Sequence, residues 1–126
     1  MYTISIDLAT KSTGIAIYKD KSLLGYSCLQ ESSTNLYKRI QGMILQIKQF
    51  IIKYNIPSNE VSYLILEEVR PDNTNGNLAT HRALMHMQGC LMLMLYASFP
   101  KIKVDYLYPS EWRKVCGIKQ GRGVRR

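Results

Sequence analysis

Two acidic residues, Asp7 and Glu67, each stand directly after a short apolar run, and this placement suits metal-assisted chemistry. In a mixed sheet, a parallel pair of strands brings two such strand ends side by side. Two carboxylates a few Å apart repel each other, and a divalent cation relieves the repulsion. Oxygen ligands without a nearby Cys or His pair favour Mg²⁺ or Mn²⁺ over zinc. From the residues alone, two structural alternatives stay open: Asp7 as a turn cap, and either acid as a salt-bridge partner.

The spacing of apolar residues predicts the elements that must position these two acids. Residues 2–7 and 15–18 flank the polar turn 9–14 as a hairpin, and residues 22–30 alternate as a third strand. A helical stripe runs from Leu36 to Tyr54 after a cap among residues 32–34, and Asn55 and Pro57 end it. The further expected elements are a strand at 61–66, a loop at 72–77, a helix at 78–98, a strand at 102–107 and a short helix from Pro109. This order predicts a single α/β domain over residues 1–126, with three antiparallel strands, then two parallel ones, flanked by helices.

The net charge of +8 favours a polyanionic partner, because the basic surplus gathers at one end. Residues 111–126 hold six basic side chains against Glu111 alone, and residues 117–126 are expected to form a mobile basic segment. A solvated tail is the alternative. In a basic protein, a two-carboxylate site points to a phosphodiester substrate, with metal ions activating water.

The predicted helix at 78–98 is apolar nearly all round in its second half. Its surplus apolar face packs either within the domain or on a second copy, and the pattern leaves both open. The methionines and the three cysteines, which show no metal-binding spacing, are interpreted as core residues. His81 and His86, five residues apart, do not share a helix face for joint metal binding. No apolar run is long enough to span a membrane, and free thiols suggest a reducing cytoplasm.

Four segments together resemble the RuvC-type Holliday junction resolvases, most of all the forms carried by phages and prophages. They read ISIDLATKSTGIAIYK, YLILEEVRP, HRALMHMQGCL and VDYLYPSEWRKVCGIK. The resemblance implies an RNase H-like fold, a bacterial or phage-encoded cytoplasmic protein, and Mg²⁺-dependent cutting of four-way junctions and other branched DNA. It implies metal binding by Asp7 and Glu67, with Glu68 as a lesser candidate, and a homodimer through the 78–98 helix. The residues expected to contact DNA are Lys11, Arg70, Arg113, Lys114, Lys119 and Arg122.

Two departures from the family pattern limit what the resemblance implies. The family completes its site with further acids on a C-terminal helix, and this sequence has no acid beyond Glu111. We therefore expect the chain to be the front portion of a longer protein, or the product of a truncated gene, with an incomplete site. Arg70 stands where some cellular members carry an aromatic residue, which weakens the case for junction-core specificity.

Three functions follow from the sequence. The first is a metal-dependent, structure-selective DNA endonuclease, and the second is a module that holds branched DNA without cutting it. The third is an actin-like ATPase or sugar kinase, since these also open with a strand, an aspartate and a polar hairpin. A chain of 126 residues is too short for the duplicated domains of an ATP cleft.

Overall fold

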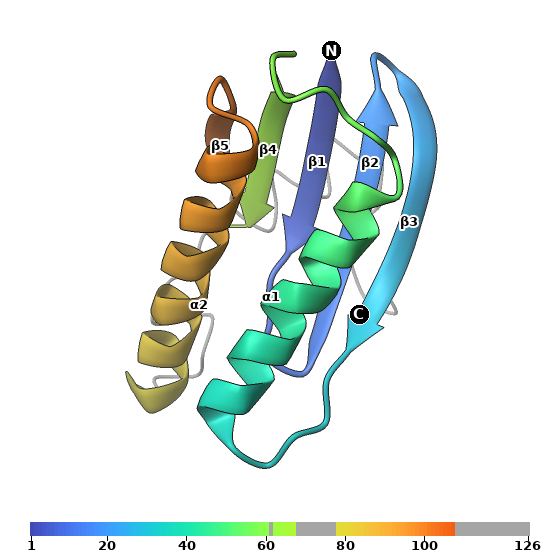
Figure 1. Cartoon of the computed structure of the whole chain (residues 1–126). Helices are drawn as coiled ribbons and strands as arrows, with labels where there is room; N and C mark the ends of the chain where they lie inside the picture. The colour runs from blue at the N-terminus through green and yellow to red at the C-terminus, as the bar shows by residue number, and fades with distance from the viewer. Residues whose placement is uncertain (61, 68–77, 108–126) are drawn as a thin grey trace, which may run out of the picture.

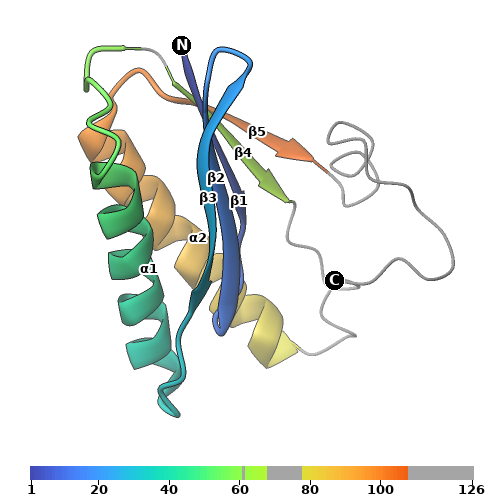
Figure 2. The same ribbon diagram turned by 90° about the vertical axis from the view of Figure 1, so that its right-hand side faces the viewer.

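The computed structural model describes residues 1–60, 62–67 and 78–107, and of residues 67 and 107 it describes the backbone. The elements follow in the order β1 (Tyr2–Asp7), β2 (Ser12–Lys19), β3 (Ser22–Gln30), α1 (Leu36–Ile52), β4 (Ser62–Glu67), α2 (Leu78–Ser98) and β5 (Lys103–Leu107). The two helices lie side by side on one face of the sheet (Figure 1). Seen from the side, both helices occupy the same layer, and the strands form the second layer (Figure 2).

The sheet has the mixed topology that the sequence predicts. The strand order is β3-β2-β1-β4-β5. β1 pairs antiparallel with β2, and β2 antiparallel with β3, whereas β4 pairs parallel with both β1 and β5. Parallel neighbours need a crossover, and α1 and α2 supply the two crossovers that lead into β4 and β5. β1 therefore lies at the centre of the sheet, between an antiparallel and a parallel neighbour.

The core fills the space between the sheet and the helices. Alternate residues of the central strands point toward the helices, and Ile4, Ile6 and Leu64 are fully buried there. From the helices, Met43 and Met87 are fully buried against them, as predicted for gap-filling methionines, whereas the same prediction is wrong for Met85, which is exposed. Burying one such side chain stabilises the fold by about 2 kcal/mol. One continuous core thus includes buried residues of α1, α2 and the strands β1, β2 and β4.

Some helices and strands begin at other residues than predicted, because local hydrogen bonds determine where each element begins. The cap of α1 is Asn35, not residues 32–34, because its side chain accepts a hydrogen bond from the Lys38 N–H at 3.1 Å. α1 ends at Ile52, and Asn55 takes the left-handed conformation with φ 49°, which stops the helix as predicted. β2 begins at Ser12, earlier than predicted, because Ser12 already pairs with Gln30 of β3.

The prediction that the cysteines are core residues is wrong for two of them. Cys28 and Cys90 are both exposed free thiols. Cys28 lies on the uncovered face of β3, and Cys90 lies on the side of α2 that faces α1. Cys116, the loop at 72–77, the helix from Pro109 and the basic segment 117–126 lie outside the described residues.

One side of α2 stays uncovered. Ala83, Met87, Leu91 and Leu95 form its buried side. Its opposite side exposes large apolar residues, with Leu93 75% and Tyr96 46% accessible. One of the two predicted alternatives was that the surplus apolar face packs within the domain. This prediction is wrong for Leu93 and Tyr96, which are exposed. In the described part of the chain, no helix is long and apolar enough to cross a bilayer.

Candidate active site at the carboxyl ends of the central strands

Asp7 and Glu67 occupy neighbouring strand ends. β1 and β4 run parallel, and their register pairs Ile6 with Leu66, so that Asp7 and Glu67 are the next residues on the two strands. Adjacent strands lie about 4.8 Å apart. The structure therefore brings the two backbone positions together at one edge of the sheet, as the sequence predicts.

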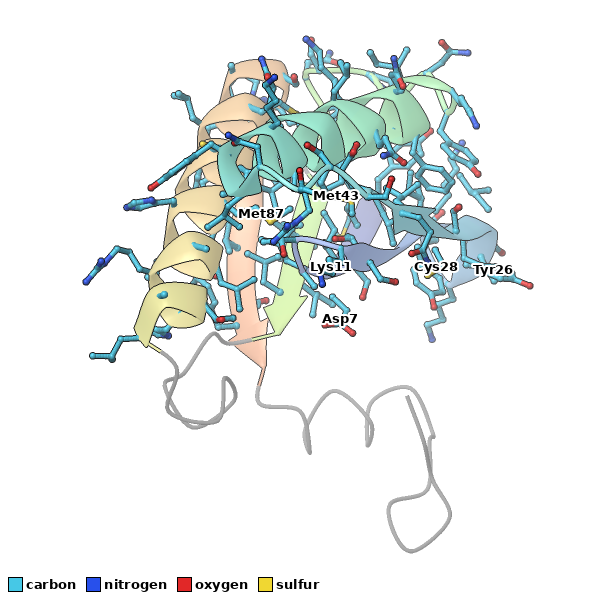
Figure 3. All side chains as sticks on the ribbon, turned by 90° about the horizontal axis from the view of Figure 1, so that it is seen from below. Asp7, Lys11, Tyr26, Cys28, Met43 and Met87 are labelled. Carbon is cyan, nitrogen blue, oxygen red and sulfur yellow. The ribbon has the colours of Figure 1, made fainter. Side chains whose placement is uncertain are left out.

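The Asp7 side chain is exposed on the face of the sheet that carries no helix. Ile4 and Ile6 point to the helices, and alternation turns Asp7 to the other face. Viewed from below, Asp7 lies on the opposite side of the sheet from the core residues Met43 and Met87 (Figure 3). Asp7 makes no hydrogen bond or ion pair with another described residue. Within that part of the chain, the carboxylate is thus available to a ligand.

Thr13, and not Asp7, closes the turn that follows β1. The Thr13 hydroxyl donates to the Ala9 carbonyl at 2.7 Å and accepts from the Ala9 N–H at 3.1 Å. The Thr13 side chain is fully buried. Asp7 makes no such hydrogen bond with the described residues, so Thr13, and not Asp7, caps the turn. Sequence reasoning missed this residue, although a Thr four residues after the start of a tight turn is a recognisable signal.

Lys11 lies at the tip of this turn with its side chain exposed. Its carbonyl accepts a hydrogen bond from the Glu31 N–H at 2.9 Å. The backbone that carries Lys11 is therefore held from β3 as well as by Thr13. Of the residues predicted to contact DNA, Lys11 is described. The others, together with the lesser metal candidate Glu68, lie outside the described residues: Arg70, Arg113, Lys114, Lys119 and Arg122.

The candidate ligands at this edge of the sheet, Asp7 and Glu67, are carboxylates, which are the ligand type that hard cations such as Mg²⁺ prefer. Within the residues that the structure describes, no group of three or more His, Cys, Asp or Glu residues could hold a metal ion. His86 is exposed and stacks on Tyr37, with ring centroids 6.3 Å apart. Mg²⁺ is commonly held by one or two carboxylates together with substrate oxygens and water. Asp7 and the Glu67 position fit that pattern as a partial site.

The fold is the RNase H-like fold. The structure is similar to Thermus thermophilus RuvC in complex with a Holliday junction substrate, with TM-score 0.67 and 11% identity over 95% of this chain and 81% of that one. A further Thermus thermophilus RuvC structure matches with TM-score 0.63 and 12% identity, over 90% of this chain and 68% of that one. No protein-family model and no curated protein sequence matches the chain. The predicted five-stranded mixed sheet with its RNase H-like fold is thereby confirmed.

Proposed function

We propose that this chain is a metal-dependent, structure-selective DNA endonuclease of the RuvC type, in the form found in phages and prophages. Its substrates are Holliday junctions and other branched DNA. One observation carries the proposal: two acidic residues end the neighbouring parallel strands β1 and β4 of an RNase H-like sheet. Similarity to a RuvC structure in complex with a Holliday junction substrate supports the choice of substrate.

In this proposal, Asp7 and Glu67 hold a Mg²⁺ or Mn²⁺ ion, with Glu68 in a lesser role. An ion held by these residues would supply activation of the attacking water and stabilisation of the leaving oxygen of the phosphodiester. Lys11, fixed at the tip of the β1–β2 turn, places its ammonium group near the substrate phosphates. Further phosphate contacts come from residues outside the described ranges, namely Arg70, Arg113, Lys114, Lys119 and Arg122.

The proposed active form is a homodimer through α2. Met85, Leu93 and Tyr96 expose apolar surface on the side of the helix away from the sheet, with accessible fractions of 44%, 75% and 46%. Gly89 lies on the same side, and a Cβ atom there would meet nothing within 4 Å. Small residues let two helices approach closely, and a two-fold axis would present two sites to one junction.

The test is a nicking assay on an end-labelled four-way junction, with Mg²⁺ and with Mn²⁺, against duplex DNA of the same length. Asp7→Asn removes one metal ligand and is expected to lower nicking at least about 100-fold. Asp20→Asn is the matched control, because it makes the same change in charge in the β2–β3 turn at the opposite end of the sheet. Equal loss in both variants, or nicking that prefers duplex DNA, would refute the proposal.

A non-catalytic module that binds branched DNA is the second candidate. The observation in its favour is that the described residues bring only two acidic positions to this edge and hold no group of three metal ligands. Tight binding of the junction without cutting in either metal would support this candidate over the nuclease. Binding is measured by the fluorescence anisotropy of a labelled junction.

A further inference from the structure

A cluster of three neutral polar side chains lies beside the candidate site, on the same open face of the sheet. The Gln30 side-chain amide donates to the Ser12 hydroxyl at 3.1 Å and contacts the Cys28 sulfur at 3.3 Å. The Ser12 hydroxyl and the Cys28 sulfur are 3.2 Å apart. Ser12 begins β2 and Gln30 ends β3, so the cluster is at the same edge of the sheet as Asp7. All three side chains are exposed.

Gly14 leaves the surface of the sheet between Asp7 and this cluster free of a side chain. The sheet register forms a row across three strands, from Asp7 to Gly14 to Cys28. A Cβ atom built on Gly14 would lie 3.9 Å from the Asp7 Cβ atom. A side chain at position 14 would therefore point to the same face of the sheet as the Asp7 side chain. Two strand spacings put Cys28 about 10 Å from Asp7. Figure 3 shows Asp7 and Cys28 on the same side of the sheet, away from Met43 and Met87.

The chemistry of the cluster suits a phosphodiester group. Hydroxyl and amide side chains are common ligands of DNA phosphate oxygens. The nearest carboxylate in sequence, Glu31, contacts the Gln46 side chain of α1 at 3.3 Å, so it is engaged on the helix side. The exposed Lys11 side chain, one residue before Ser12, adds a positive charge. An anion at the cluster, on the far side of Gly14 from Asp7, thus meets neutral polar groups and a lysine.

We propose that Ser12, Cys28 and Gln30 form a subsite for a backbone phosphate of the DNA strand that flanks the reacting phosphate at Asp7. This subsite rests on the proposed nuclease function, and it specifies the course of the DNA strand over the open face of the sheet. A separation of about 10 Å lies within a few nucleotides along one DNA strand. The strand then crosses β2 at Gly14, the one position in the row where no side chain stands in its way.

A charge placed in the cluster tests the subsite through binding. Gln30→Glu places a carboxylate beside the bound phosphate, and is expected to raise the KM for the junction about tenfold with kcat unchanged. This is the effect of one charge roughly 6 Å from a phosphate at an effective dielectric near 40. Gln49→Glu is the matched control, since it makes the same change at an exposed position on α1. Equal KM values for the two variants would overturn the subsite.

A second measurement needs no substitution and no catalysis. Alkylation of each cysteine in the full chain is followed by peptide mass spectrometry, with and without a saturating four-way junction in EDTA. The subsite predicts that DNA slows the alkylation of Cys28 at least about fivefold and leaves exposed Cys90, on α2, unchanged. Junction binding without protection of Cys28 would overturn the subsite while leaving the nuclease intact. No junction binding at all would overturn the proposed function and the subsite with it.

Discussion

Replacing Thr13 by valine removes the hydroxyl that closes the turn after β1 and keeps the volume of the side chain. The lost contacts are the hydrogen bonds from the Thr13 hydroxyl to the Ala9 carbonyl and from the Ala9 N–H to the hydroxyl. Each is worth about 1 kcal/mol net, so the free energy of unfolding should fall by about 2 kcal/mol. Because the Thr13 side chain is fully buried, no water replaces the hydroxyl at that point. The cost rises toward about 3 kcal/mol if the Ala9 groups stay unpaired.

Urea denaturation followed by circular dichroism measures this change. With a slope near 2 kcal/mol per molar urea, the midpoint of Thr13→Val should fall by about 1 M. Thr13→Ser is the control, since it keeps the hydroxyl and loses one methyl group, at a cost of about 1 kcal/mol. Thr13 positions the turn that carries Lys11, so Thr13→Val should also raise the KM for the junction, and serine should restore it. A Thr13→Val protein within about 0.5 kcal/mol of the parent would refute this account of the turn.

Three further results are expected. Leu64→Ala, at a fully buried position, should lower the free energy of unfolding by about 2–5 kcal/mol, whereas Leu93→Ala should change it by less than about 0.5 kcal/mol, both measured by urea denaturation. Leu93→Arg should convert a dimer into a monomer in sedimentation velocity with unchanged circular dichroism; a dimer that survives it would exclude this face of α2 as the interface. Chelation by EDTA should abolish nicking and added Mg²⁺ should restore it, whereas nicking in EDTA would refute metal dependence.

The sheet and the neighbouring positions of Asp7 and Glu67 could be predicted because they follow from strand periodicity and topology. Alternating residues identify β1, and the apolar run before Glu67 identifies a central strand. Once β1 and β4 are parallel neighbours, their carboxyl ends must meet at one edge. A single sequence carries that information, because each acid follows an apolar run and is the last residue of its strand.

The environments of the cysteines could not be predicted in the same way. Cys90 lies in a helix segment that is apolar on all sides, so no period tells which side the sheet covers. Cys28 alternates with Leu29 on an edge strand, and it is the inward turn of Leu29 that leaves the thiol exposed. The Ser12–Cys28–Gln30 cluster depends on the register of β2 with β3, which no local pattern fixes. These features needed the tertiary structure.

The placement of the core explains why the candidate site can be open. The helices cover one face of the sheet, and the fully buried side chains of the central strands, such as Ile4 and Leu64, point to that face. The other face holds small or polar residues near Asp7, including Ser5 and Gly14, which contribute little to the core. Stability and chemistry therefore depend on opposite faces of the same strands. If the proposed function is correct, a change at Asp7 or Gln30 alters DNA binding at little cost in folding, whereas a change at Leu64 lowers stability and leaves the open face intact. The nicking and alkylation experiments depend on this separation. Asp7 and Cys28, which they probe, lie on the open face, and their controls Asp20 and Cys90 lie away from the candidate site.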